Sequence, residues 1–354
     1  MTVLVTGGTG FVGAHSVVAL LAAGHQVRLL VRDQARVPAT LLPLGVEPAT
    51  IDVVTGDVTD PEAVAAAVQG CTSVLHAASV YSFNTRDHPR LRAVNVRGTE
   101  VVLGAAVAAG LDPVVHVSSF GALLPAGQTP VTPNAEVGTP REAYLDSKAR
   151  ADRVARRYQA EGMPVVVTYP LAALGPHDPY LGDQTNRLRN VLRGLMPIWP
   201  RGGFPVGDVR DVARLHAAVL EPGRGPRRYL GPGRYVDTRE YLRVLRRVTG
   251  RTLPAVRLPA SAMLPVGALT GLVQRVVPVH LPAEYGAIYT CAVARPVDTT
   301  RTNRLLGGPT VPFEQTVTDT VAWLAATGHL TPRQAGRLAA PRPAPSAHQV
   351  DGPR

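Results

Sequence analysis

The sequence predicts an α/β protein, with a doubly wound parallel sheet over residues 1–170 and a smaller, irregular substrate lobe over residues 171–330. Two observations carry this prediction. Apolar β-runs alternate with alanine-rich helical stretches through the first half of the 354-residue chain. A glycine-rich turn joins the first β-run to the first helical stretch, and a strand, a turn, a helix and a second strand within about 30 residues form the unit that builds parallel sheets.

Six strands are expected in this first half, each followed by a turn and most by a helix. The strands are Thr2–Thr6, Gln26–Val31, Asp52–Thr55, Ser73–Ala77, Val114–Ser118 and Val165–Tyr169, and the helices between them include Pro61–Val68, Leu91–Ala109 and Arg141–Glu161. Asp60 stands at the start of one helix, while Gly110 and Gly162 follow the ends of the other two. These are the residues that helix ends favour.

The alternation weakens beyond Pro170, where prolines multiply and turn-like patches separate short elements. We expect pieces near 205–220 to return to the main sheet. The longest uncharged apolar stretch, Leu258 to Gln274, contains two prolines and is short for a membrane span, so it predicts buried or pocket-lining segments. Residues 331–354 are rich in Pro, Ala and Arg and lack apolar periodicity, which predicts a disordered tail.

The composition is that of a globular protein with a basic surface. There are 37 basic and 26 acidic residues, for a net charge of +11. Because the arginines are scattered and neither a zinc-finger spacing nor a single basic helix is present, we expect no nucleic-acid partner. Cys71 and Cys291 cannot form a disulfide framework, and the chain starts directly with an apolar strand. A cytoplasmic location without stable membrane insertion is therefore expected.

The glycine turn predicts a dinucleotide site. Gly7, Gly10 and Gly13 have G-x-x-G-x-x-G spacing between a strand and a helix. The first glycine permits a tight turn, the second lets the backbone approach a pyrophosphate, and the third lets the helix pack on the strand. The helix N-terminus supplies positive potential. The expected binding residues here are Gly7, Thr9, Gly10, Phe11, Val12 and Gly13.

The residue that closes the second strand predicts which dinucleotide binds. Arg32 holds this position, and a guanidinium there can grip the 2′-phosphate of NADP. NADP is therefore expected. The alternative is that Arg32 points to solvent and Asp33 holds the ribose of NAD. Further expected contacts are Asp57 and Val58 after the third strand, with Asp57 accepting from the adenine amino group, and the small residues Ala77, Ala78 and Ser79 after the fourth.

Lys148 is the only lysine in the chain, and it stands four residues after Tyr144. Residues at i and i+4 share a helix face, so the two side chains project together. A phenol titrates near 10 in water. An adjacent ammonium is expected to lower that pKa by about 1–3 units and make the phenol a usable general acid or base.

Two polar groups are expected near this pair. Ser118 and Ser119 close the fifth strand, where a hydroxyl can bind the same substrate oxygen that Tyr144 protonates. Asn95 lies in a mostly apolar helical stripe. The alternatives are an ordinary serine pair at a strand end and an interior amide that satisfies backbone groups.

These motifs together resemble the extended short-chain dehydrogenase/reductase family. The resemblance runs over about residues 1–330. It includes the Thr-Gly-Gly-Thr-Gly-Phe-Val-Gly start, the Tyr-x-x-x-Lys pair, Val209-Arg210-Asp211-Val212-Ala213 and the close from Asp298 to Leu324, and it is strongest to the dihydroflavonol-reductase-like and 3β-hydroxysteroid-dehydrogenase-like branch. It implies a Rossmann NADP-binding domain, a catalytic set and further cofactor contacts. The catalytic set is Asn95, Ser119, Tyr144 and Lys148, and the added contacts are Ser118, Pro170 and Leu171.

The resemblance implies hydride transfer between nicotinamide and a substrate carbon, without a metal. Tyr144 would protonate the nascent alkoxide, Ser119 would hold the oxygen, and Lys148 would hold the nicotinamide ribose. Asn95 would support a water that leads protons away. A homodimer is also compatible with this reading.

Three functions remain open at this point. The leading one is an NADP-dependent reductase of an apolar or aromatic carbonyl compound, or the reverse oxidation of its alcohol. The alternatives are a nucleotide-sugar epimerase or dehydratase and a non-catalytic NADP-binding regulator. Dehydratases generally carry an Asp-Glu pair where this chain has Phe120-Gly121. The candidate substrate-pocket residues are Tyr81, Phe83, Phe120, Leu171, Tyr180, Trp199 and Phe204.

Overall fold

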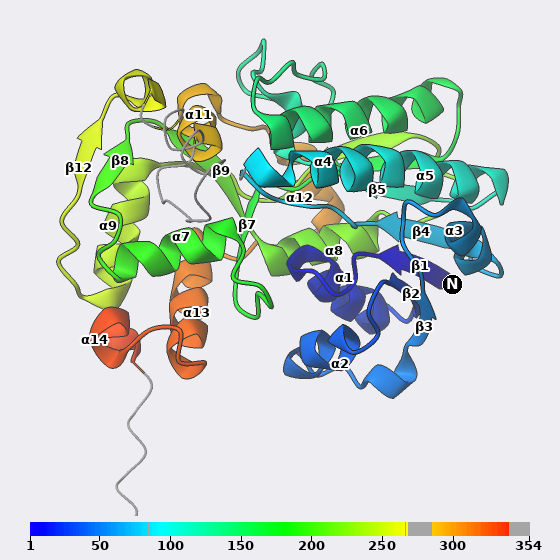
Figure 1. Ribbon diagram of the computed structural model, residues 1–354, viewed down its shortest axis with the longest axis horizontal. Coiled ribbons are helices and arrows are strands. Elements are labelled where there is room, and N and C mark those ends of the chain that lie inside the picture. Colours follow the sequence, from blue (N-terminus) through cyan, green and yellow to red (C-terminus); the bar gives the residue numbers. More distant parts are fainter. Residues whose placement is uncertain (84, 266, 268–284, 340–354) are drawn as a thin grey trace, which may run out of the picture.

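The computed structural model describes residues 1–83, 85–265, 267 and 285–339. Figure 1 shows a larger body built around the N-terminal strands and a second lobe beside it, which contains most of the C-terminal elements. The stretch Leu258 to Gln274 is described only up to Pro265 and at Gly267, so most of the expectation for it lies outside the described residues.

Seven strands among the described residues form one parallel sheet in the order β10-β6-β5-β4-β1-β2-β3. The order reverses between β1 and β4, as in a doubly wound sheet, and the predicted fold class is confirmed. The strands are β1 (Thr2–Thr6), β2 (Gln26–Val31), β3 (Asp52–Thr55), β4 (Ser73–His76), β5 (Val114–Val117), β6 (Val165–Tyr169) and β10 (Arg227–Leu230). The central strands are buried along their whole length, as a sheet covered on both faces requires.

Helices cover both faces of this sheet (Figure 1). On one face α1 packs against α8, and on the other α5 packs against α3 and α6. The helices of this body are α1 (Phe11–Ala22), α2 (Arg36–Leu41), α3 (Pro61–Val68), α4 (His88–Arg90), α5 (Gly98–Ala108), α6 (Ala143–Ala160) and α8 (Val209–Ala218). The predicted cap residue Asp60 accepts hydrogen bonds from the backbone N–H groups of Glu62 and Ala63.

The second lobe contains two small sheets among the described residues. One has the order β11-β9-β7, and the other pairs β12 with β8. Its elements are β7 (Ala172–Leu174), α7 (Asp183–Leu192), β8 (Ile198–Pro200), β9 (Gly203–Asp208), β11 (Arg234–Asp237), α9 (Thr238–Thr249), β12 (Val256–Leu258), α11 (Tyr285–Val293), α12 (Thr300–Leu306) and α13 (Phe313–Ala326). Although α8 and β10 follow residue 170, they belong to the main body. The predicted boundary at 170 stays a prediction.

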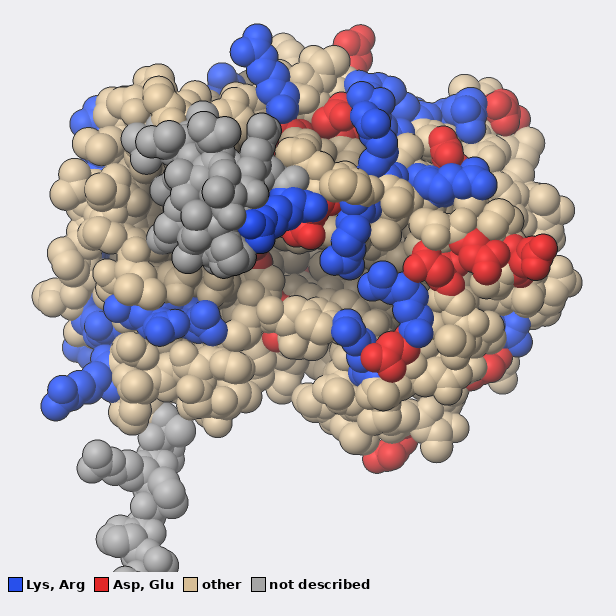
Figure 2. Space-filling view, in the orientation of Figure 1, with Lys and Arg blue, Asp and Glu red and all other residues tan. Residues whose placement is uncertain are grey.

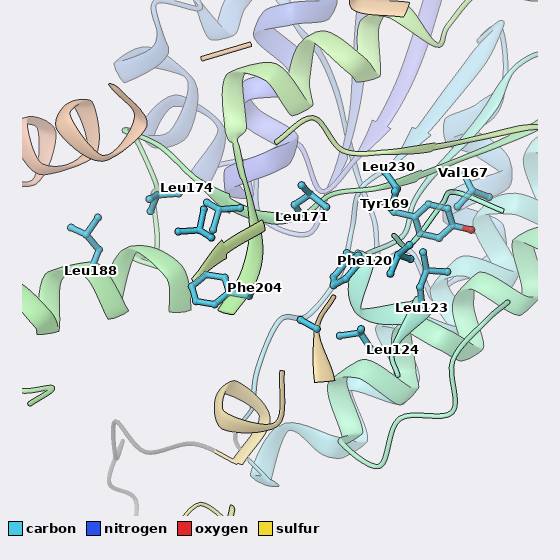
Figure 3. Packing of buried hydrophobic residues seen from close by; sticks show 14 of the residues in the cluster. Phe120, Leu123, Leu124, Val167, Tyr169, Leu171, Leu174, Leu188, Phe204 and Leu230 are labelled. Atoms are coloured by element: carbon cyan, nitrogen blue, oxygen red, sulfur yellow. The ribbon is translucent and has the colours of Figure 1, made fainter. Parts of the chain in front are cut away.

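Apolar packing joins the sheet to the second lobe. Figure 3 shows Phe120 and Leu171 at the end of the main sheet, with Phe204 of β9 and Leu188 of α7 beyond them. All four belong to one buried hydrophobic cluster. This cluster fixes α7 and β9 relative to the carboxyl edge of the main sheet, where the candidate site lies.

A buried histidine links three elements of the main body. His216 of α8 lies 2.7 Å from Ser16 of α1 and 3.1 Å from Thr168 of β6. Since the Ser16 hydroxyl donates to the carbonyl of Val12, it accepts from Nδ1 of His216, and Nε2 then accepts from Thr168. The chain of hydrogen bonds fixes one tautomer and holds α1 and α8 against the sheet.

The structure differs in detail from two local expectations. The stretch predicted as one helix over Leu91–Ala109 begins with a π-helical segment, Leu91–Arg97, before α5. Such segments are rare and frequently lie at functional sites. The predicted tail starts too early, because Pro332–Ala335 form α14. Thr331 caps this helix in a capping box with Gln334, and Ala335 is buried. Residues 340–354 lie outside the described part of the chain.

Candidate active site

The carboxyl ends of β1, β4, β5 and β6 border a cavity of about 440 Å³. Figure 2 shows a hollow near the centre of one face, with blue basic side chains around it. Most of the predicted site residues line this cavity: Gly7, Gly10, Phe11, Val12, Gly13, Ala77, Ser79, Ser118, Ser119, Tyr144, Lys148, Pro170 and Leu171. The fold thus brings the glycine turn and the Tyr-Lys pair to one place.

The glycine turn leaves no room for side chains. Gly7 has φ +75°, and a Cβ there would lie 2.6 Å from the backbone nitrogen of Ala78. A Cβ on Gly13 would lie 2.0 Å from the carbonyl oxygen of Gly7. The first turn of α1 carries no acidic residue, and Gly10 provides no side-chain cap. The free N–H groups at this helix start therefore fit a pyrophosphate.

Six predicted site residues do not line the cavity: Thr9, Arg32, Asp57, Val58, Ala78 and Asn95. Arg32 is exposed at the end of β2. Its neighbour Asp33 accepts hydrogen bonds from the backbone of Ala35 and from the Arg36 side chain, at 3.0 and 3.3 Å. Oδ1 of Asp57 accepts from the backbone and hydroxyl of Thr59. The expected adenine and ribose contacts stay predictions.

Tyr144 stands in the first turn of α6, which Glu142 fixes. The buried carboxylate of Glu142 accepts from the backbone N–H groups of Tyr144 and Leu145, at 3.0 and 2.8 Å. The Tyr144 ring is 7% exposed and packs edge-on against Tyr81, with 4.5 Å between ring centroids. Phe83 packs edge-on from a second side. The cap and the aromatic contacts together hold the phenol in one orientation.

The expected lowering of the Tyr144 pKa by Lys148 was wrong for this structure. Burial raises the pKa of Tyr144 above its ordinary value, and a hydrogen bond with Ser119 acts in the opposite direction. Lys148 is not among the groups that shift it. Instead, its Nζ donates to the carbonyl oxygen of Val117 at 3.0 Å. Desolvation is the largest influence on the Tyr144 pKa, so the phenol stays protonated at neutral pH.

Lys148 is itself almost completely buried, with 3% of its surface exposed. Burial lowers the pKa of Lys148 to about 8, and the carboxylate of Asp152 acts in the opposite direction. Asp152 accepts from Nε of Arg156 at 2.8 Å and from the hydroxyl of Tyr169 at 3.3 Å. Lys148, Asp152 and Arg156 thus form a row of alternating charge along one face of α6. Sequence reasoning missed Asp152, although its i+4 spacing from Lys148 was a usable signal.

Asn95 acts as a bridge behind the cavity. It lies in the π-helical segment and is 1% exposed. Its amide oxygen accepts from the backbone N–H of Val80 at 2.7 Å, and its amide nitrogen donates to the Val80 carbonyl and to the Ser147 hydroxyl, both at 2.9 Å. The side chain therefore joins the loop after β4 to α6, beside Tyr144. The alternative of an interior amide that satisfies backbone groups describes these contacts.

Aromatic, aliphatic and charged side chains from both the main body and the second lobe line the rest of the cavity. Tyr81, Phe83, Phe120, Leu171, Tyr180 and Phe204 line it, as expected. Trp199 does not, because it packs in the core against Tyr241 and donates its indole N–H to the carbonyl of Met196. Asp183, Gln184 and Arg187 of α7 also line the cavity. Sequence reasoning missed them, because nothing in the local pattern ties α7 to the sheet edge.

Comparison with known proteins decides the family. The sequence profile described as the NAD dependent epimerase/dehydratase family matches residues 3–230, which is more than half of the chain. The chain belongs to this epimerase/dehydratase family. It is 32% identical to sterol demethylase protein B of Methylococcus capsulatus over 337 residues, covering 93% of this chain and 99% of that protein. It is 34% identical to a putative dihydroflavonol 4-reductase of Synechocystis over 276 residues, covering 74% and 76%.

Solved structures agree with the family assignment. DesIV, a dTDP-glucose 4,6-dehydratase from Streptomyces venezuelae crystallised with NAD, superposes with a TM-score of 0.71 at 25% identity, over 94% of this chain and all of that chain. The epimerase/dehydratase family member described here is therefore an extended short-chain dehydrogenase/reductase, an oxidoreductase acting on a CH–OH or C=O carbon with a nicotinamide cofactor.

The described residues offer neither a membrane-spanning helix nor a cluster of metal ligands. None of their helices is both long and apolar enough to cross a bilayer. None of their His, Cys, Asp and Glu side chains gather in threes to hold a metal ion.

We predict that Asp152→Asn shifts the titration of Lys148 to lower pH. The carboxylate raises the pKa of Lys148, so its removal, with Arg156 left in place, lowers that pKa below about 8. The ammonium, which is expected to hold the cofactor, is then lost about 1 pH unit earlier. The measurement is the dissociation constant of the reduced cofactor by fluorescence between pH 6 and 10.

Asp146→Asn is the matched control for this test. Asp146 lies on the same helix and pairs with Arg150 at the surface, at 2.7 Å. Its variant should titrate like the parent protein. Equal midpoints for the Asp152 variant and the parent would show that the row of charges does not control Lys148.

Proposed function

We propose that this enzyme reduces the carbonyl of an apolar or aromatic small molecule with NADPH, or oxidises the corresponding alcohol. The observation that carries the proposal is the convergence of Tyr144, Lys148 and Ser119 on one cavity with the glycine turn. Aromatic and aliphatic side chains form much of the remaining wall, which suits an apolar substrate. The names of the relatives, a putative dihydroflavonol 4-reductase and a sterol demethylase protein, support the same substrate class.

In this proposal the phenol of Tyr144 is the general acid for reduction. Its raised pKa keeps the proton on the phenol until an alkoxide forms beside it. Ser119, which forms a hydrogen bond with Tyr144, orients the same substrate oxygen. A nicotinamide cofactor, when bound, supplies or accepts the hydride.

Lys148 and Asn95 have different parts in the proposal. Lys148 lines the cavity, and its ammonium holds the ribose of the nicotinamide. Asn95 is a positioning residue, because its side chain is fully engaged by Val80, Ser79 and Ser147. The predicted water beside it remains part of the proposal.

The runner-up is a nucleotide-sugar epimerase or dehydratase. The solved structure of DesIV belongs to that class. Against it, the position after Ser119 holds Phe120, which is 4% exposed and packs in the core, where a dehydratase needs acidic side chains. A non-catalytic NADP-binding regulator is disfavoured because the Tyr-Lys pair is intact and faces the cavity. A location in the cytoplasm and a homodimer stay predictions.

The NADP preference rests on Arg32. It is exposed at the carboxyl end of β2, and its side chain forms no hydrogen bond or ion pair with the described residues. Arg36 lies near, with its guanidinium 5.7 Å from the centre of the Tyr180 ring. Two guanidinium groups at this edge favour the 2′-phosphate over a plain ribose.

Tyr144→Phe should abolish turnover and leave cofactor binding intact. The phenylalanine keeps the ring contacts but cannot donate a proton, so we expect kcat to fall by about 10²–10⁴-fold. The measurement is NADPH oxidation against ketone, aldehyde and UDP-sugar panels, with cofactor binding followed by fluorescence. Tyr158→Phe on the same helix is the control and should keep full activity. Retained activity in the Tyr144 variant would refute the assignment.

Arg32→Asp should reverse the cofactor preference. The parent protein should have a much lower KM for NADPH than for NADH, since only NADPH carries the 2′-phosphate. In the variant an acidic group repels that phosphate and accepts from the ribose hydroxyls of NADH. Arg243→Asp, an exposed site on α9, controls for the change in net charge. Equal KM values for the two cofactors in the parent protein would contradict the NADP proposal.

A further inference from the structure

Helix α7 places a guanidinium in the wall of the cavity. Arg187 lines the cavity, and its guanidinium lies 5.3 Å from the centre of the Phe204 ring. Figure 3 shows Phe204 beside α7, the helix that also carries the labelled Leu188. Across the described residues, Arg187 has no hydrogen-bond acceptor and no ion pair. The other cation in the described wall, Lys148, is engaged by the carbonyl of Val117.

An unpaired guanidinium in such a wall is costly. Arg187 has five N–H donors, is partly buried, and faces aromatic and aliphatic groups. Stacking on Phe204 offsets part of this cost but satisfies none of the donors. A ligand oxyanion would satisfy two donors at once in the bidentate geometry that guanidinium groups favour. The group therefore suits ligand recognition better than fold stability.

Two acidic residues also border this region. Asp178 is occupied internally, because it accepts from the Gly182 backbone at 2.9 Å and from the Thr185 hydroxyl at 2.7 Å. Asp183 lies within electrostatic reach of both Arg187 and Tyr144. Its carboxylate lowers the positive potential at Arg187. Among the described residues that line this end of the cavity, Arg187 carries the one positive charge.

We infer that Arg187 binds a carboxylate on the substrate while the substrate's carbonyl lies at Tyr144. This inference rests on the proposed reductase function. Tyr81 separates the two ends, because its ring contacts that of Tyr144 at 4.5 Å and its hydroxyl lies 3.5 Å from Nε2 of Gln184, in the same part of α7 as Arg187. The substrate class is thus an apolar or aromatic ketone or aldehyde with a carboxylate at its far end.

The single cation argues for a carboxylate over a diphosphate. A nucleotide diphosphate carries two or more negative charges and needs several cations or N–H donors. Among the described residues that line the cavity, only Lys148 and Arg187 carry a positive charge. Lys148 lies at the end of the cavity where the cofactor is proposed to bind. A singly charged oxyanion matches the one guanidinium, that of Arg187, which α7 contributes to the described lining of the cavity.

The test compares 4-acetylbenzoate with its methyl ester, which keeps the ketone and the ring but lacks the negative charge. The parent enzyme should prefer the carboxylate in kcat/KM. Arg187→Met keeps the aliphatic contact with Phe204 but removes the charge, and should raise KM for the carboxylate by about 10–100-fold, so that the preference for the carboxylate over the ester is lost. Arg187→Lys should recover part of the loss. Arg193→Met, exposed at the end of the same helix, is the matched control.

Binding without turnover separates this inference from the proposed function. Calorimetry with 4-tert-butylbenzoate, the corresponding neutral amide and UDP-glucose, each with NADP present, measures recognition alone. If neither ketone is reduced but the benzoate binds the parent enzyme and not the Arg187→Met variant, the carboxylate site stands and the proposed reaction fails. An unchanged preference in Arg187→Met, or tighter binding of UDP-glucose than of the benzoate, overturns the inference.

Discussion

The ammonium of Lys148 lies buried beneath the carboxyl edge of the main sheet, and much of the site is arranged around this buried charge. The Val117 carbonyl at the end of β5 accepts from it, and Asp152 opposes the loss of its proton. Burying a charge without such partners costs several kcal/mol. These contacts tie α6 to β5, so the same helix also holds Tyr144 in place. Because Arg156 satisfies Asp152 from the next turn, the whole polar row remains inside the apolar interface between helix and sheet.

A second chain of hydrogen bonds in the core links β1 to the π-helical segment. The Thr99 hydroxyl donates to the carbonyl of Asn95, so it must accept from Nε2 of His76. Nδ1 of His76 then accepts from Thr6 at the end of β1. This chain runs from the strand that precedes the glycine turn to the π-helical segment behind Tyr144. Burial lowers the pKa of His76 to about 3, so the imidazole stays neutral and the direction of the chain is fixed.

Short-range sequence patterns were enough to predict the strands of the main body. The strands end within a residue of their predicted positions, since buried parallel strands are continuous apolar runs bounded by turns. The glycine spacing and the Tyr144–Lys148 pair are also local patterns, and they predicted two sides of the cavity. The position of Arg187 depends on contacts between α7 and distant β9, which no local pattern encodes. The sign of the Tyr144 pKa shift was also beyond the sequence, because desolvation depends on the aromatic groups that the fold packs around the ring.

The central claim is that position 148 requires a compact ammonium and not merely a positive charge. Replacing Lys148 by arginine tests it most directly, with cofactor binding, steady-state turnover and thermal unfolding measured on the same preparation. A guanidinium is larger, planar and cannot satisfy the Val117 carbonyl in the same space. We expect the Lys148→Arg enzyme to fold but to lose about 10²-fold or more in kcat/KM, with weaker cofactor binding. Activity within about threefold of the parent would show that any positive charge suffices at position 148.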